Sequence, residues 1–181
     1  MKIPRSIQVV LFFFLVTQSI SCSSDLDFNQ TQNLKLAPTY VANLVYFDIP
    51  APEFVTAGSE NQFFSRFTTD IFNKTFFVNN LNKVDFNFEI NNTINRAYLL
   101  EVQLLDAKGI RLDSIDISIP AYLGVKNVIT QKEIFQGTRL GVLKKTTKIQ
   151  MALRMLSGAP ISESSTGKIN LRSGLTAYFE I

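Results

Sequence analysis

The chain has 181 residues and a formal net charge of +3, with one cysteine, no histidine and no tryptophan. The absence of histidine excludes Ser-His-Asp and Cys-His catalysis, HExxH zinc sites and an imidazole base at neutral pH. Part of the small positive charge comes from Lys2 and Arg5 in a segment that we expect to be removed, so the sequence indicates no nucleic-acid partner.

Residues 1–21 have the three-part layout of a secretory signal peptide. A basic start is followed by the apolar run 9–16 and then by small and polar residues. The apolar run is too short to cross about 30 Å of hydrocarbon as a helix. We therefore predict a cleaved signal peptide over residues 1–21.

Cys22 stands directly after this segment, where cleavage is expected. The tetrapeptide Ser19-Ile20-Ser21-Cys22 resembles a bacterial lipobox, in which the cysteine receives lipid, although Ser19 replaces the usual large aliphatic residue. Lipidation explains both the number and the position of the cysteine, because a leftover thiol is a liability in an oxidising compartment. The alternative is ordinary cleavage near Ser21 or Ser23 that leaves a free thiol.

The rest of the chain divides into a tether and one domain. Residues 22–39 comprise the lipidated cysteine and a polar tether, and residues 40–181 are long enough for a single core without disulfides. Residues 40–49 predict a strand that is apolar on both faces and that Pro50 ends. A loop is expected at residues 57–59.

Apolar and polar residues alternate strongly in the middle of the chain. Residues 84–90 and 98–104 each predict a strand with one buried face. Residues 106–109 predict a hairpin connection, with glycine supplying a positive φ. The return strand, residues 110–119, changes phase near Asp113–Ser114, which predicts a β-bulge there.

The final third adds weaker and stronger elements. Residues 125–129 predict a weak strand, residues 138–144 a short helix capped by Thr138, and residues 149–155 and 169–181 two further strands. The total is seven to nine strands with at most one short helix. This pattern predicts an all-β, antiparallel β-sandwich of the Ig-like or fibronectin-like kind, with a β-barrel as the alternative.

The sequence contains no convincing catalytic, metal or cofactor motif. Glu89 and Glu101 fall on adjacent predicted strands, but both belong to the polar face of their strand. Asp113 and Asp116 lack the ligand-rich loop that a hard cation needs. We therefore predict a protein that is not an enzyme and that carries no metal and no cofactor, and an enzyme using carboxylates alone is the least favoured alternative.

Aromatic residues are mostly phenylalanine at core positions. The doublets Phe63-Phe64 and Phe76-Phe77 are expected to put one ring each on an outer face. Such rings indicate either a second covered face or a hydrophobic surface for a partner.

Ser114 is a candidate modification site. Asp113-Ser114-Ile115 is similar to the Asp-Ser/Thr-apolar acceptor for protein O-glycosylation in Bacteroidetes-type bacteria. The triplet coincides with the predicted bulge, where a side chain can turn outward. A chance match of three residues is the alternative.

The whole mature chain resembles a family of small Bacteroidetes or flavobacterial lipoproteins for which no activity is known. The resemblance is carried by the lead-in Cys-Ser-Ser-Asp-Leu-Asp-Phe from Cys22, the strand 44–48 with its Pro-Ala-Pro-Glu-Phe continuation, the connection 91–96, and the terminal Tyr-Phe-Glu-Ile. It implies a β-rich fold and attachment to the outer membrane through a lipid, on the periplasmic or the cell-surface side.

These observations lead to three hypotheses for the function. The first is a lipid-anchored, non-enzymatic module that binds or scaffolds another envelope component, with a role for the C-terminal strand in pairing with a partner. The second is a small-ligand or glycan binder, which clustered outward tyrosines would favour. The third is a pilus-like subunit that exchanges strands, which a groove missing one strand would favour. The tyrosines relevant to the second hypothesis are Tyr40, Tyr46, Tyr98, Tyr122 and Tyr178.

Overall fold

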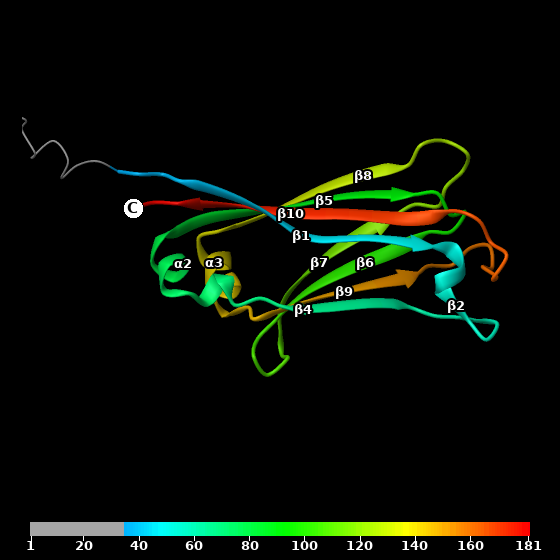
Figure 1. The fold of residues 1–181 in the computed structure, drawn as a ribbon, viewed down its shortest axis with the longest axis horizontal. Coiled ribbons are helices and arrows are strands. Elements are labelled where there is room, and N and C mark those ends of the chain that lie inside the picture. Colours follow the sequence, from blue (N-terminus) through cyan, green and yellow to red (C-terminus); the bar gives the residue numbers. More distant parts are fainter. Residues whose placement is uncertain (1–34) are drawn as a thin grey trace, which may run out of the picture. The chain divides into compact units, whose positions relative to one another are not determined.

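The computed structural model describes residues 35–181, so the predicted signal peptide and Cys22 lie outside the described residues. This part of the chain folds into two four-stranded antiparallel sheets that face each other (Figure 1). The first sheet has the order β1-β10-β5-β8 and the second β4-β9-β6-β7. The strands are β1 (Thr39–Pro50), β4 (Phe63–Thr68), β5 (Leu81–Asn92), β6 (Tyr98–Leu105), β7 (Arg111–Ile119), β8 (Val128–Gln136), β9 (Lys148–Met155) and β10 (Lys168–Phe179).

The predicted all-β antiparallel sandwich is confirmed, and neither sheet closes into a barrel. The strands pair from the outside inward along the chain: β1 with β10, β4 with β9, β5 with β8, and β6 with β7. This nested order is that of a rolled-up hairpin, the jelly-roll form of the sandwich. It differs from the immunoglobulin order, because β10 is inserted between β1 and β5 in the middle of its sheet.

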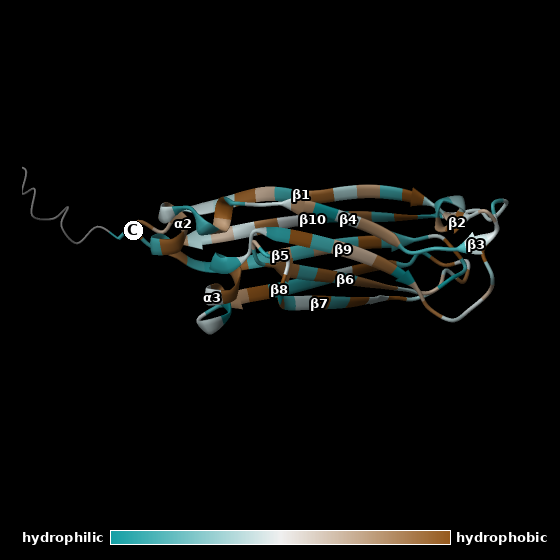
Figure 2. Ribbon diagram, turned by 90° about the horizontal axis from the view of Figure 1, so that it is seen from below, coloured by the Kyte–Doolittle hydropathy of each residue, from teal (hydrophilic) through white to brown (hydrophobic). Residues whose placement is uncertain are grey.

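The core lies between the sheets and follows the period-2 pattern of the sequence (Figure 2). Along β5, Val84, Phe86 and Phe88 are buried, whereas Asn87 and Glu89 between and after them are exposed. Burying each such apolar side chain contributes about 1.5–3 kcal/mol to folding. The strands predicted over residues 84–90 and 98–104 are thus present with the expected faces.

Two β-bulges shift the alternation where the sequence changes phase. In β7, Leu112 has no partner between the pairs Leu104–Asp113 and Leu105–Arg111, one residue before the predicted position. In β1, Leu44 is likewise left out of the pairing with β10. The Ser173 hydroxyl fixes this second bulge, because it accepts from the Val45 N–H (3.1 Å) and donates to the Val45 carbonyl (3.0 Å). The β1 bulge explains why this strand reads as apolar on both faces.

The helices differ from the prediction in number and in capping. Helix α3 (Thr138–Lys145) confirms the helix expected over 138–144, but Gly137, with φ of 57°, occupies the N-cap and Thr138 is the first helical residue. The helix α2 (Thr75–Asn80) was not predicted, since its Phe-Phe-Val run is typical of a strand. Both helices lie at one end of the sandwich (Figure 1). In residues 35–181 no helix has the length and apolar character needed to cross a bilayer.

Two connections are irregular. Short 3-10 turns, η2 (Ala51–Phe54) and η3 (Ile71–Asn73), precede the small hairpin of β2 (Val55–Thr56) and β3 (Ser59–Glu60) and the helix α2, respectively. The hairpin turns at residues 57–58, both at positive φ, where a loop was expected.

Strand β8 begins later and runs further than the predicted strand 125–129. Its inward positions include Gln131 and Glu133, which are half-buried at the rim of the sandwich. Glu133 accepts a hydrogen bond from Arg139 at 3.2 Å. The sequence of β8 lacks a clear apolar–polar alternation, because polar side chains at inward positions of an edge strand can form hydrogen bonds at the rim of the sandwich.

Gly167, at the entry to β10, is expected to tolerate no side chain. Its φ is +96°, and an added Cβ would lie 2.3 Å from the Thr93 carbonyl oxygen. Thr93 cannot move away easily, because its N–H donates to the Lys168 carbonyl (2.9 Å) and its hydroxyl accepts from the Lys168 N–H (2.8 Å). Gly167→Ala should lower the free energy of unfolding by about 2–4 kcal/mol, measured by urea denaturation.

Gly141→Ala is the matched control. Gly141 lies in α3 with nothing within 4 Å of an added Cβ and without a positive φ. Alanine there should raise the free energy of unfolding by about 0.5–1 kcal/mol. Equal effects of the two substitutions would contradict this account of Gly167.

Candidate functional site

The outer surface of the first sheet is the candidate site, and we call it the polar face. It consists of the side chains of β1, β10, β5 and β8 that point away from the second sheet. The strand register arranges these side chains in rows across the sheet. One row is Tyr46, Arg172, Glu89 and Thr130, the next is Asn43, Gly174, Asn87 and Lys132, and a third is Asp48, Asn170, Asn91 and Val128.

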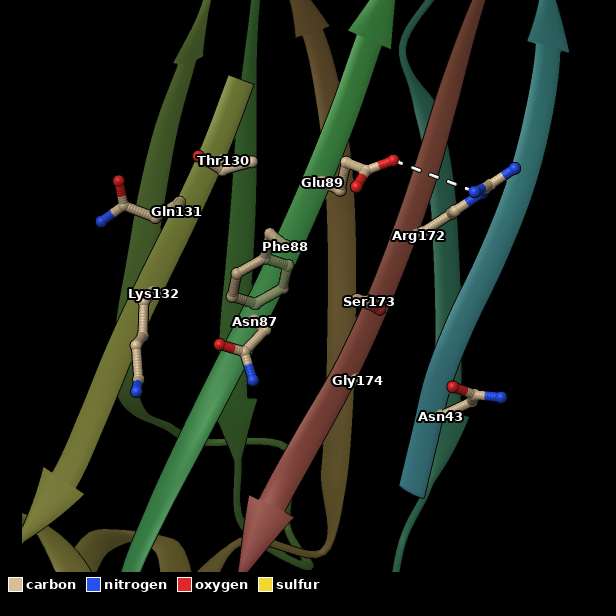
Figure 3. Close-up of a pocket in the computed structure, with 10 residues that line it drawn as sticks. All are labelled: Asn43, Asn87, Phe88, Glu89, Thr130, Gln131, Lys132, Arg172, Ser173 and Gly174. Carbon is tan, nitrogen blue, oxygen red and sulfur yellow. Dashed lines mark ion pairs between the residues drawn. The ribbon is translucent and has the colours of Figure 1, made fainter. Parts of the chain in front are cut away.

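A depression of about 420 Å³ lies around Gly174 (Figure 3). Gly174 has no side chain, so its row is hollow between Asn43 on β1 and Asn87 on β5. The glycine is favoured by packing, because an added Cβ would lie 3.1 Å from the Ala42 carbonyl oxygen, a tight contact. Lys132 and Arg172 also line this hollow and give it cationic groups beside two amides.

A second depression of about 450 Å³ adjoins the first and shares Glu89 and Arg172 with it. Glu89 and Arg172 form a loose ion pair at 3.9 Å. On the other side of the second depression, Lys168 contacts the Asp48 carboxylate at 2.8 Å, and this hydrogen bond raises the pKa of Lys168. The Tyr46 ring, 64% exposed, also lines this depression. The two depressions therefore offer amides, both signs of charge and one exposed aromatic ring, since Phe88 of the first depression is buried.

Asp85 is the one buried carboxylate among the described residues of the polar face, with 1% of its surface exposed. Its Oδ2 atom contacts Lys132 Nζ (2.7 Å) and Lys83 Nζ (3.3 Å) and accepts a hydrogen bond from the Tyr178 hydroxyl (3.2 Å). Lys83 also lies 4.0 Å from the centre of the Tyr178 ring. The long stems of these side chains cover Asp85, although it points outward from the sheet.

The charge state of Asp85 follows from these contacts. Burial acts to raise its pKa, but the hydrogen bonds with Lys132 and Lys83 outweigh burial and hold the pKa below its usual value. Its Oδ1 atom has no hydrogen-bond partner within residues 35–181. The group is therefore an ionised, paired carboxylate whose removal would leave two lysines facing each other.

The predicted candidate residues lie apart from the polar face or outside the described residues. Cys22 is in the undescribed part of the chain. Ser114 lies on β7, half-buried on the outer side of the second sheet, and pairs with Gln103. Glu89 and Glu101 belong to different sheets, so the expectation that they lie on adjacent strands was wrong. In the described part of the chain no three His, Cys, Asp or Glu residues form a metal-binding group.

The aromatic residues are scattered over the molecule. Tyr98 is fully buried, Tyr122 lies in the loop between β7 and β8, and Tyr40 is at the start of β1. Only Tyr46 and Tyr178 lie on the polar face, at rows far apart along β10. Each phenylalanine doublet exposes one ring: Phe64 on β4, as expected for a strand, and Phe76 on α2, where a helix stands in place of the expected strand.

Sequence reasoning missed the Gly174 hollow and the Asp85 cluster. Both sit at polar positions of strands that were predicted, so the alternation carried a partial signal. The two lysines of the cluster come from β5 and β8, and the tyrosine comes from β10, so only the pairing of these strands brings them together.

Comparisons with known proteins give no family for this chain. No protein-family model matches it, and no curated protein is significantly similar to it. Similar solved structures include infectious bursal disease virus, Gx strain (TM-score 0.41, 10% identity, 81% of this chain and 32% of that one). Another is a candidate secreted protein from Parabacteroides distasonis (TM-score 0.45, 13% identity, 65% of this chain and 37% of that one). A third is tailspike protein 4 of bacteriophage CBA120 (TM-score 0.37, 15% identity, 81% of this chain and 19% of that one). Likeness at this level supports no inference about function.

Asp85→Asn should destabilise the domain in a pH-dependent way. At pH 7 the substitution should lower the free energy of unfolding by about 1–3 kcal/mol, because it leaves Lys83 and Lys132 without a countercharge. Because the pKa of Asp85 is lower in the folded than in the unfolded state, its ionised form stabilises the fold fully at pH values above the unfolded pKa of about 3.9. This stabilisation is lost as the pH falls through the folded-state pKa. The difference between wild type and variant should therefore shrink below about pH 4, as measured by denaturation across pH.

Asp48→Asn is the matched control. Its partner Lys168 is half exposed, and Asp48 itself is about one-third exposed, so water screens the pair. The substitution should change the free energy of unfolding by less than about 1 kcal/mol. An Asp85→Asn variant as stable as Asp48→Asn would contradict the role assigned to Asp85.

Proposed function

We propose that the chain is a non-enzymatic binding protein of the bacterial envelope, held in the outer membrane by a lipid on Cys22. The polar face serves as its recognition surface. The observation that carries this proposal is the pair of adjoining depressions on that face, which present amides and both signs of charge across four hydrogen-bonded strands. The N-terminal signal pattern of residues 1–21, followed by Cys22, supports the anchor.

A non-catalytic role agrees with the placement of the acidic residues. Glu89 and Glu101 lie on different sheets, so they cannot act on one bond as a carboxylate pair. The polar face instead has Glu89 beside Arg172 and Asp48 beside Lys168, and such pairs suit a complementary polar surface on a partner. The favoured partner is therefore another envelope component with a polar surface.

Strand exchange receives no support from the arrangement of the strands. Strand β10 is paired along both of its edges, with β1 and with β5, so it has no free edge to offer a partner. Each sheet has its four strands, and the jelly roll is complete. Recognition by side chains of the polar face is the simpler account.

Glycan binding is the second candidate. One observation favours it: the exposed Tyr46 ring lies beside Asp48, Asn170 and Arg172, a combination of a flat apolar surface and hydrogen-bonding groups. The scatter of the other tyrosines counts against an extended sugar-stacking platform. This candidate therefore ranks below recognition of an envelope component.

The anchor is tested by intact mass of the protein extracted from membranes. Wild type should exceed the mass of chain 22–181 by a set of acyl chains, and Cys22→Ala should lose both the extra mass and the membrane association. A soluble mature chain with a free thiol would refute the anchor.

The recognition surface is tested by photo-crosslinking in intact cells. A photo-reactive amino acid in place of Asn87, in the centre of the polar face, should give discrete adducts. The same amino acid in place of Asp116, on the outer side of the second sheet, is the control and should give none. Adducts from Asp116 alone, or from neither position, would contradict the assignment of the polar face.

The glycan candidate is tested by calorimetric titration with purified envelope polysaccharide. Tyr46→Ala should weaken binding by about tenfold if the ring stacks on a sugar. Tyr40→Ala, at an exposed tyrosine away from both depressions, is the control and should leave binding unchanged. Absence of binding by the wild type would remove this candidate.

A further inference from the structure

One end of the sandwich exposes several apolar side chains, and we call it the apolar end. Leu36, Tyr40, Phe76, Val78 and Ile181 are each between 38% and 53% exposed. They come from the segment before β1, from β1 itself, from α2 and from the last residue of the chain. A groove of about 430 Å³ with an almost entirely apolar lining runs between Tyr40 and Phe76.

Helix α2 contributes Phe76 and Val78 to the apolar end. It has no fully buried residue, which is unusual for a helix so rich in apolar side chains. Phe77 holds the helix to the domain, because its ring packs edge-on against the rings of Phe179 and Phe72. The distances between ring centres are 5.0 Å and 6.4 Å, respectively. Phe76 contacts the same Phe179 ring at 5.1 Å, yet 48% of its surface stays exposed. The exposed ring is therefore fixed in place by its neighbours.

The charges around the apolar end lie at its rim and are mostly paired. Lys35 contacts Glu180 at 3.3 Å, and Lys74 contacts Asp70 at 2.6 Å. Lys144 donates a hydrogen bond to the Val78 carbonyl at 2.6 Å. An apolar centre with aromatic rings and a rim of lysines is the composition that side chains at a lipid–water interface have. A rim near neutrality suits a bilayer that is mostly zwitterionic.

The chain leaves the domain at this same end. Leu36 and Ile181 exchange two backbone hydrogen bonds, at 3.0 and 2.9 Å, so the segment that leads to Cys22 joins the domain inside the patch. Residues 23–34 connect Cys22 to Lys35 and can span at most roughly 45 Å. A tether of this reach keeps the domain close to the lipid surface at a high effective concentration, without itself fixing the orientation of the domain.

We propose that the apolar end rests on the lipid surface in which Cys22 is anchored, and that it orients the domain. This inference rests on the proposed lipid anchor. Phe76, Val78 and Tyr40 insert into the interfacial layer, while the paired charges Lys74–Asp70 and Lys35–Glu180 lie at the level of the headgroups. The loop between β7 and β8 lies at the opposite end of the sandwich from α2 (Figure 1). In the proposed orientation that end points away from the membrane.

The absence of tryptophan from the sequence allows a direct test. Phe76→Trp in the full, lipidated protein places a single fluorophore in the patch, in vesicles of phosphatidylethanolamine with a minor fraction of phosphatidylglycerol and brominated acyl chains. Leu123→Trp is the control, because Leu123 is 82% exposed in the loop at the other end. Phe76→Trp should show at least about twofold stronger quenching, since interfacial side chains sit about 5–10 Å into the headgroup and acyl boundary.

Equal quenching of the two variants, or none in either, overturns the proposed orientation. A patch that is instead covered by a second copy of the chain also overturns it, and would appear as a dimer after cross-linking in the same vesicles. Intact mass of each sample separates this failure from failure of the anchor. An acylated, membrane-bound protein with unquenched Trp refutes the orientation alone, whereas an unacylated, soluble protein refutes the anchor and the orientation with it.

Discussion

The insertion of β10 between β1 and β5 is the constraint on which the rest of the structure depends. Because the last strand is central, the first sheet is complete only when the two ends of the described chain have met. This pairing fixes the β1 bulge through Ser173, and it creates the hollow at Gly174. It also brings the segment before β1 to the end of the chain. Contacts of such long sequence separation slow folding, because the entropy of closing the chain must be spent before the pairing stabilises the sheet.

The same pairing explains why the outer side of one sheet carries the candidate site. A strand with one buried face must present its other face to solvent, so every apolar position inside the sandwich implies a side chain outside it. On β5 this rule produces both the ordinary polar residues and Asp85, which long neighbouring side chains then cover. The polar face thereby combines a hydrogen-bonded sheet with side chains that are already held by ion pairs.

The polar face and the apolar end lie on different parts of the domain and suit different partners. The polar face is formed along the strands, whereas the apolar end is formed by α2 and the segments at the ends of β1 and β10. If the apolar end rests on lipid, the strands extend outward from the membrane. The polar face then faces sideways, roughly parallel to the membrane plane. Under the two proposals the orientation and the recognition surface thus both follow from one fold, whereas the anchor rests on the sequence around Cys22.

The sequence by itself determined the all-β antiparallel class, the buried faces of β5, β6, β9 and β10, the hairpin after β6 and the presence of a bulge in β7, because these depend on local alternation and turn chemistry. It did not indicate β4, and it placed β8 too early in the chain. It also carries the signal pattern around Cys22, which remains a prediction. Strand order, the Gly174 hollow, the Asp85 cluster and the apolar end were decided only by the tertiary structure. Each of them joins residues from strands or segments far apart in the chain, and alternation says which face a residue takes but not which strand lies beside it.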